Sequence, residues 1–218
     1  MARVASPSIV VAGIGTDVGK TVASAVLCEA LGADYWKPIA SGSEDGPVDH
    51  EVLETLIEPR SGRIHPPQYL FKRSLSPHIA ARLEGAAIDL AMLQPPKTER
   101  PLVIERAGGV AVPITDTLTN LDLAAKLRLP VVVVSRHYLG SINHTLLTVE
   151  ALKNRAIPVA GVVFNGEELP DTERIITVMA GVPNLGRIPH LEVMSRETIS
   201  SLARELGPRL RSEISRLG

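Results

Sequence analysis

The chain has 218 residues, of which 44% are hydrophobic and only 3% aromatic, so one domain spanning residues 1–218 is expected, with a core of valine, isoleucine, leucine and alanine. Its formal net charge of −1 argues against a nucleic-acid partner, and the longest aliphatic run, Val131–Val134, is far too short to cross a membrane. The single cysteine, Cys28, excludes an intrachain disulfide, and the first residues lack a signal-peptide pattern, so we expect a cytoplasmic protein.

Apolar runs typical of strands alternate with helical patterns along the chain. The expected strands are Ile9–Ala12, Tyr35–Ala40, Leu102–Glu105, Val131–Ser135, Val159–Asn165 and Asn184–Arg187. The expected helices are Thr21–Leu31, His50–Ile57, Pro77–Leu83, Leu121–Leu127, Ile142–Arg155, Thr172–Met179 and Arg196–Leu217. Strands that are apolar on both faces and separated by helices indicate a mostly parallel sheet covered by helices on both sides, which is a three-layer α/β fold. The proline-containing segment Glu58–Tyr69 is expected to be an irregular surface excursion.

The segment between the first strand and the first helix is rich in glycine and reads Gly13-Ile14-Gly15-Thr16-Asp17-Val18-Gly19-Lys20-Thr21. Glycines allow backbone N–H groups to turn toward an anion, and the helix N-terminus adds a positive dipole. Lys20 can place its charge on the terminal phosphates of a nucleotide, and the Thr21 hydroxyl can ligate Mg²⁺. The first glycine lies one residue earlier than in the simplest G-x-x-x-x-G-K-[ST] motif, so the loop is longer by one. The segment predicts a phosphate loop and, with the alternating strands, a P-loop NTPase-like fold.

Two charged side chains are expected at strand ends, where ligands gather in parallel sheets. Lys37 lies in the otherwise apolar second strand and should point its ammonium group toward the phosphates, and Ser41 beyond it offers a hydroxyl to an anion. Glu105 ends the third strand, where an ATPase holds Mg²⁺ or its water. Two plainer interpretations stay open, namely a lysine that merely extends to solvent and a salt bridge from Glu105 to Arg106 or Lys37.

Three further positions carry weaker patterns. Asp49 directly precedes a helix, so the residues alone favour a helix cap over a second carboxylate ligand for a metal. Gly140-Ser141 opens a helix whose free N–H groups would bind a carboxylate or form an ordinary N-cap. Asn165-Gly166 ends the fifth expected strand and Pro189-His190-Leu191 follows the sixth, at positions where a purine base could rest.

These sequence motifs, in the order in which they occur along the chain, resemble those of dethiobiotin synthetases. The Lys-Pro-x-x-Ser-Gly and Leu-Gly-x-Ile-Asn-His elements are the most specific, and the resemblance covers nearly the whole chain. The residues that carry it are Gly13, Thr16–Thr21, Lys37–Gly42, Ser76–His78, Glu105–Gly109, Val112–Ile114, Leu139–His144, Asn165 and Ile188-Pro189. The reaction that this resemblance implies converts 7,8-diaminononanoate, CO₂ and MgATP into dethiobiotin, ADP and phosphate.

The resemblance implies ATP and Mg²⁺ as cofactors and gives roles to the matching residues. Lys20 and Lys37 would be the catalytic cations on either side of the transferring phosphoryl group. Thr21, Asp49 and Glu105 would hold Mg²⁺, so Asp49 is expected to be a metal ligand rather than a cap. The nucleotide would contact Gly15, Thr16, Asp17, Val18, Gly19, Lys20, Thr21, Val22, Asp49, Glu105, Arg106, Ala107, Gly108, Asn165, Gly166, Pro189, His190 and Leu191.

The resemblance also implies a homodimer whose two sites are composite, with a small-molecule substrate and neither nucleic acid nor membrane as a partner. The Gly140 and Ser141 N–H groups would bind the substrate carboxylate across the dimer interface. The full set of expected substrate contacts is Ser41, Thr16, Pro113, Gly140, Ser141 and Asn143.

Two residues depart from the family's pattern. Asp17 stands where members often carry glutamate, and Arg106 stands where they often carry glycine, so Arg106 is expected to add a cation near the nucleotide. The main alternative is a regulatory ATPase of the ParA/MinD type. That class has a second lysine where this chain has Gly15, and it lacks a strand lysine followed by Pro-x-x-Ser-Gly.

Overall fold

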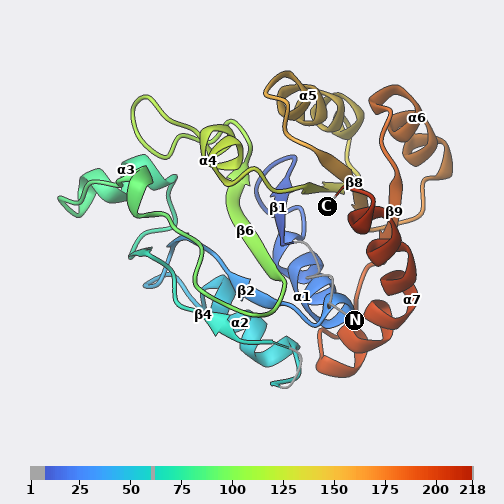
Figure 1. Cartoon of the computed structure of the whole chain (residues 1–218), viewed down its shortest axis with the longest axis horizontal. Helices are drawn as coiled ribbons and strands as arrows, with labels where there is room; N and C mark the ends of the chain where they lie inside the picture. Colours follow the sequence, from blue (N-terminus) through green and yellow to red (C-terminus); the bar gives the residue numbers. More distant parts are fainter. Residues whose placement is uncertain (1–7, 60–61, 218) are drawn as a thin grey trace.

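The computed structural model describes residues 8–59 and 62–217, and a parallel sheet of seven strands forms its centre (Figure 1). The strands are β1 Ile9–Gly13, β2 Asp34–Trp36, β4 Ile64–His65, β6 Leu102–Gly109, β7 Val131–Arg136, β8 Val159–Asn165 and β9 Asn184–Ile188. Their spatial order is β4-β2-β6-β1-β7-β8-β9, and all neighbouring pairs are parallel. The carboxyl ends of all these strands therefore lie at one edge of the sheet.

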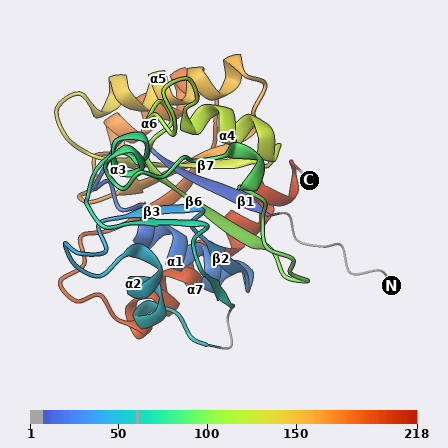
Figure 2. The same cartoon turned by 90° about the vertical axis from the view of Figure 1, so that its left-hand side faces the viewer.

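Helices cover both faces of the sheet, as Figure 2 shows. One face carries α1 (Lys20–Leu31), α2 (Asp49–Leu56) and α7 (Arg196–Ser215), and the other carries α4 (Asn120–Leu127), α5 (Ser141–Asn154) and α6 (Pro170–Ala180). Two separate clusters of buried apolar side chains fill these interfaces, because successive residues of a strand point to opposite faces. The expected three-layer α/β fold is confirmed, and each expected helix is present with bounds within two residues.

The expected strand Tyr35–Ala40 is wrong as one continuous element, because the chain breaks at Lys37-Pro38. β2 ends before this pair, and β3 (Ile39–Ser41) belongs to a separate two-stranded sheet with β5 (Tyr69–Phe71). Proline has no N–H group to donate to a neighbouring strand, and the Pro38 carbonyl accepts instead from the Gln68 N–H at 3.0 Å. The break leaves Lys37 at the carboxyl edge of the central sheet.

The segment Glu58–Tyr69, expected to be irregular, contains the edge strand β4, which pairs with β2; residues 60 and 61 lie outside the described part of the chain. Asp34 stabilises this edge, since its carboxylate accepts from the Arg63 N–H at 2.8 Å and lies 3.1 Å from His65 Nε2. A strand of two residues is too short to show an alternation of apolar and polar residues, so the sequence pattern does not reveal it.

The remaining elements form a smaller layer beside β6. They are α3 (Pro77–Leu83) and the 3₁₀ helix η1 (Leu90–Met92), which enclose a third apolar cluster with β3, β5 and α4. β6 continues past the expected end at Glu105 to Gly109, where the Asn120 side chain donates to the Gly109 carbonyl at 3.0 Å. This bond joins the end of β6 to the start of α4.

Candidate active site

The phosphate loop connects β1 to α1 and is held in place by hydrogen bonds to its backbone. Lys20 Nζ donates to the Gly15 carbonyl at 2.8 Å, and Asn165 Nδ2 donates to the Val18 carbonyl at 2.9 Å. Gly19 has φ +92°, a left-handed conformation that glycine adopts without strain, and a Cβ there would clash with the Asn165 side chain. The end of β8 therefore packs directly against the loop.

Four side chains from different parts of the chain meet beside this loop. Thr21 Oγ1 donates to Asp49 Oδ1 at 2.6 Å and lies 3.2 Å from Glu105 Oε1. The Lys37 ammonium bonds to Asp49 Oδ2 and, at 3.2 Å, to Glu105 Oε1. The helix-cap interpretation of Asp49 is wrong, because Val48 is the N-cap of α2 and the Asp49 carboxylate points to Lys37 and Thr21.

Within this cluster, the attraction between opposite charges opposes the effect of burial on the pKa values. Burial raises the pKa of the Glu105 carboxyl, although Lys37 opposes the shift. Burial alone would lower the pKa of Lys37, but the charges of Glu105 and Asp49 outweigh it and raise that pKa. For Asp49, the attraction of Lys37 outweighs burial and lowers the pKa to about 2. At neutral pH the cluster therefore holds a charged lysine next to the Asp49 carboxylate.

The oxygen atoms of Thr21, Asp49 and Glu105 form a donor set that suits Mg²⁺. This ion takes hydroxyl and carboxylate oxygens and keeps several coordination positions for water and phosphate. Within residues 8–59 and 62–217, no three His, Cys, Asp or Glu side chains gather into a metal-binding group. Nucleotide phosphates and water would therefore have to complete the coordination of a magnesium ion here.

These groups line a cleft of about 970 Å³ at the carboxyl ends of the strands. The predicted site residues that line it are Thr16, Asp17, Gly19, Lys20, Thr21, Val22, Lys37, Ser41, Asp49, Glu105, Ala107 and Gly108. Lining residues not predicted for the site are Gly42, Asp45, Gly46, Pro47, Val48, Val52, Ser74, Leu75, Ser76, Pro77, Val112 and Met194. Asp45 ties two of these loops together, because its Oδ2 accepts from the Ser74 N–H at 2.6 Å.

Other predicted site residues do not line this cleft in the described structure. Asn165 and the residues that follow β8 and β9 lie at the same strand edge, and the Gly166 N–H donates to the Ile188 carbonyl at 2.9 Å. Pro113 forms an isolated bridge with Thr119 before α4. The remaining members of this group are Gly15, Val18, Arg106, Gly166, Pro189, His190, Leu191, Gly140, Ser141 and Asn143.

The start of α5 forms the helix opening predicted at Gly140-Ser141. Gly140 is the N-cap with φ +104°. The Ser141 side chain is buried, whereas Asn143 in the same turn is exposed. A ligand at this helix start would therefore meet the backbone and Asn143 rather than the Ser141 hydroxyl.

Arg136 is a residue at the loop that the sequence analysis missed. It ends β7, and its Nη1 donates to the Asp17 carbonyl at 3.3 Å. Asp17 has φ +56°, which is uncommon for a residue other than glycine. The rule that ligands gather at strand ends applies to Arg136 as well as to Lys37 and Glu105, so that rule would have identified it.

Arg106 lies away from the cleft, although it was expected to add a cation near the nucleotide. Side chains alternate along β6, so Arg106 points to the face opposite Glu105, where it is 2% exposed. None of its guanidinium nitrogens has a hydrogen-bond partner. Burial lowers the pKa of Arg106 to about 9, and Asp122 opposes this shift. The side chain therefore destabilises the fold rather than contributing to the cleft.

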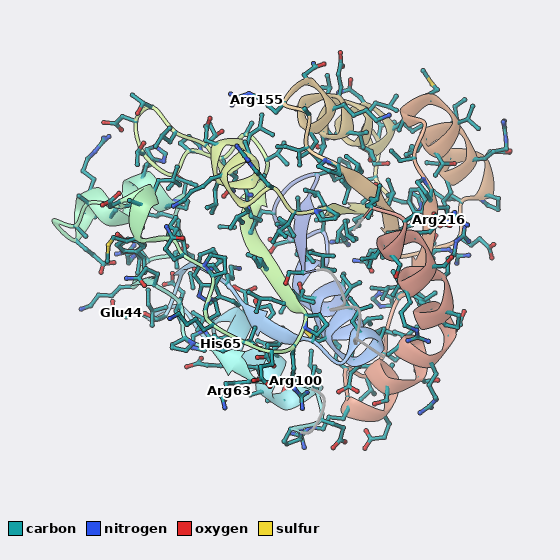
Figure 3. All side chains as sticks on the ribbon, in the orientation of Figure 1. Glu44, Arg63, His65, Arg100, Arg155 and Arg216 are labelled. Atoms are coloured by element: carbon teal, nitrogen blue, oxygen red, sulfur yellow. The ribbon has the colours of Figure 1, made fainter. Side chains whose placement is uncertain are left out.

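Replacing Arg106 with methionine should stabilise the protein by about 1–4 kcal/mol, because an apolar side chain removes the buried, unpaired charge. Urea unfolding at pH 7 measures the change. Arg155→Met is the control: Arg155 lies at the end of α5 (Figure 3), its side chain is 50% exposed, and it pairs with Asp122 at 3.0 Å. The control should change stability by about 1 kcal/mol or less. A clear loss of stability in Arg106→Met would contradict this interpretation.

A second hollow, of about 630 Å³, lies at the amino ends of β2 and β6, away from the phosphate loop. Figure 3 labels Arg63, His65 and Arg100 in this region. The buried carboxylate at its base, Asp34, already accepts from Thr98 Oγ1 at 2.7 Å in addition to its bonds with His65 and Arg63. Those bonds join β2 to the segments beside it at the edge of the sheet. This structural role explains why a carboxylate is buried at Asp34.

Lys20 lies in a glycine-rich loop at the start of α1 and faces the carboxylates at the strand ends. This arrangement defines the chain as a P-loop ATPase. A family model described as an AAA domain matches residues 7–198. The ATP-dependent dethiobiotin synthetase BioD of Nitrobacter hamburgensis is 46% identical over 194 residues, which cover 89% of this chain and 91% of that protein. The protein of the same name from Agrobacterium fabrum is 46% identical over 190 residues, with coverages of 87% and 89%. The chain therefore belongs to the dethiobiotin synthetase family of ATP-dependent ligases, as the resemblance predicted.

Solved structures show how widely this fold is shared. A ParA family ATPase from Chlorobium tepidum aligns with a TM-score of 0.55 at 14% identity, covering 96% of this chain and 97% of that chain. The cell division ATPase MinD of Pyrococcus furiosus aligns with a TM-score of 0.56 at 16% identity, covering 97% of this chain and all of that chain (100%). At these identities the likeness shows the P-loop α/β fold alone.

Proposed function

We propose that this chain makes dethiobiotin from 7,8-diaminononanoate, CO₂ and MgATP. The observation that carries the proposal is the convergence of Lys20, Lys37 and the carboxylates of Asp49 and Glu105 at one end of the cleft. Such a group of cations and metal-binding oxygens suits the transfer of a phosphoryl group from one anion to another.

The reaction has three steps, and each needs charge stabilisation. One amine nitrogen of the substrate attacks the carbon of CO₂ and loses a proton, which gives a carbamate. A carbamate oxygen attacks the γ-phosphorus of ATP, and ADP leaves. The second amine attacks the carbonyl carbon of the mixed anhydride, phosphate leaves, and the ureido ring closes with loss of a proton. Since the carbamate and the γ-phosphate are both anions, cations must lie between them.

The cleft residues divide between these tasks. Lys20 binds the terminal phosphates from the loop side, and Lys37 neutralises the charge shared by carbamate and γ-phosphate from the opposite side. Thr21, Asp49 and Glu105 would hold Mg²⁺, and the ion would supply charge neutralisation to the phosphates. The further substrate contacts that we propose are Ser41, Thr16 and Pro113.

We assign the nucleotide to the loop and the neighbouring strand ends. The backbone from Gly15 to Val22, with Ala107 and Gly108, contacts the phosphates. The purine lies against Asn165, Gly166 and Pro189–Leu191. The direct packing of Asn165 on Gly19 supports this assignment, because it brings the end of β8 next to the phosphate loop.

We also propose that residues 1–218 form one cytoplasmic domain and that two copies form a dimer with composite sites. No described helix is long and apolar enough to cross a membrane. Tyr138, Leu139, Ile142 and Leu147 expose large apolar side chains around the start of α5, which supports a partner there. The Gly140 N–H group and Asn143 would bind the substrate carboxylate of the partner's site, whereas the Ser141 N–H, also expected to bind it, already donates to the Tyr138 carbonyl at 2.9 Å.

Asn143→Glu should raise the Michaelis constant for the diamine and leave that for ATP nearly unchanged, because it places a like charge beside the substrate carboxylate. Asn143 is chosen because it is exposed, whereas a charge at buried Ser141 would disturb the fold. Asn154→Glu, at the opposite end of the same helix, is the matched control.

Mixing Asn143→Glu with Lys37→Ala protein tests the composite sites. In a mixed dimer one site is intact and the other carries both changes, so equal mixing should restore about a quarter of the wild-type sites. Steady-state rates after verified subunit exchange measure the recovery. No recovery, or a monomer in sedimentation at working concentration, would contradict this arrangement.

Phosphate release from purified protein tests the proposed function directly. Release should require the diamine, bicarbonate and MgATP together and should stop when any one is omitted. Mass spectrometry of the product should show the ureido compound. Steady ATP hydrolysis that is indifferent to the diamine would contradict the proposal and favour a regulatory ATPase.

A further inference from the structure

We infer that Tyr35 is a positioning residue that fixes the orientation of the Glu105 carboxylate for the magnesium ion. This inference rests on the proposed role of Glu105 as a metal ligand. Tyr35 is the middle residue of β2 and pairs in register with Val103 of β6. Because side chains alternate along a strand, Tyr35 and Glu105 point to the same face of the sheet, toward α1.

The two carboxylate oxygens of Glu105 have different partners. Tyr35 Oη donates to Oε2 at 3.1 Å, whereas Thr21 Oγ1 and Lys37 Nζ each lie 3.2 Å from Oε1. Thr21 and Lys37 line the cleft, and Tyr35 does not. The Tyr35 hydroxyl therefore holds Oε2 of Glu105, and Oε1 stays beside Thr21 and Lys37, which face the cleft.

Burial keeps water from replacing the hydroxyl of Tyr35. Tyr35 and Glu105 are both 0% exposed, so bulk water cannot substitute as a donor to Oε2 when the hydroxyl is removed. A phenol keeps its proton at neutral pH and remains a donor. Groups that orient a metal ligand in this way typically change metal affinity by roughly 10- to 100-fold.

The test compares Tyr35→Phe, which removes only the hydroxyl, with Tyr69→Phe as the matched control. Tyr69 Oη accepts from the Asp89 N–H at 3.0 Å, outside the cleft lining. Paramagnetic resonance measures Mn²⁺ binding to protein saturated with a non-hydrolysable ATP analogue, and calorimetry measures analogue binding without metal.

We expect Mn²⁺ affinity to fall roughly 10-fold or more in Tyr35→Phe and to stay unchanged in Tyr69→Phe. Binding of the ATP analogue without metal should be the same in both variants. If Tyr35→Phe disordered the whole site, the metal-free binding of the analogue would weaken as well. Wild-type Mn²⁺ affinity in Tyr35→Phe would overturn the inference, and so would an equal loss of metal and metal-free analogue affinity.

Glu105→Gln separates the failure of this inference from that of the proposed function. If Glu105→Gln binds Mn²⁺ as tightly as wild type, the metal-ligand assignment fails, and the inference fails with it. If Glu105→Gln weakens Mn²⁺ binding and Tyr35→Phe does not, only the role of Tyr35 fails.

A second measurement applies if Tyr35→Phe does not fold. The chain has three tyrosines, so fluorine NMR of protein containing 3-fluorotyrosine gives a Tyr35 resonance that Tyr69→Phe and Tyr138→Phe assign by elimination. Adding Mg²⁺ to the analogue-saturated protein should shift that resonance more than the other two. An unmoved Tyr35 resonance would overturn the inference.

Discussion

Replacing Lys20 with alanine should leave a folded protein whose turnover is about 100-fold lower or worse, because one preorganised cation is lost from the transferring phosphoryl group. The Lys20 ammonium donates to the Gly15 carbonyl of its own loop, so replacing the side chain leaves the apolar core intact. Phosphate release at saturating substrates measures turnover, and circular dichroism checks the fold.

Lys72→Ala is the control for this experiment. The Lys72 side chain is 62% exposed and pairs with Glu44 at 3.1 Å, and neither residue lines the cleft, so its loss should leave turnover unchanged. Near wild-type turnover in Lys20→Ala would refute the assignment of the phosphate loop to ATP.

Lys37→Ala should reduce turnover by about 100-fold or more while MgATP binding changes far less. Lys37 reaches the cleft from between β2 and β3, not from the phosphate loop, so the proposed site gives it the carbamate as well as the γ-phosphate. Calorimetry with a non-hydrolysable analogue, beside steady-state rates, separates the two effects. A collapse of nucleotide affinity with normal turnover at saturation would make Lys37 only a nucleotide anchor.

The same substitution should lower thermal stability. Without the Lys37 ammonium, the buried Glu105 carboxylate and Asp49 face one another with no cation between them. Breaking a buried charge pair by removing one partner typically costs about 3–5 kcal/mol. Rates should therefore be measured well below the unfolding temperature, which calorimetric scanning determines, and Lys72→Ala again serves as the control.

Most of the fold was predictable because its signals are local. The strands of the central sheet are apolar on both faces, and Gly19, Lys20 and Thr21 mark the turn between the first strand and its helix. Lys37 and Glu105 could be placed at the strand edge for the same reason, since each is a charge at the end of an apolar run. The register that brings them together was not predictable, because it depends on pairing between segments 68 residues apart.

The missed features depend on distant contacts. Pro38 breaks the second expected strand, but only the pairing of β3 with β5 shows that a second sheet begins there. Tyr35 looks like an ordinary core residue until β6 is placed beside β2. Asp49 looks like a helix cap in the sequence because the partners of its carboxylate, Thr21 and Lys37, come from other elements.

The position of β6 between β1 and β2 also fixes the order in which the site is assembled during synthesis. The phosphate loop, Lys37 and Asp49 leave the ribosome well before Glu105, which lies 84 residues after Thr21 in the chain. Inserting β6 between two earlier strands closes long loops, and this step is entropically costly. Nucleotide can stabilise only the chain in which that insertion is complete. Binding of MgATP therefore reports that β6 is in place between β1 and β2, and a nascent chain that ends before β6 has the loop but not the site.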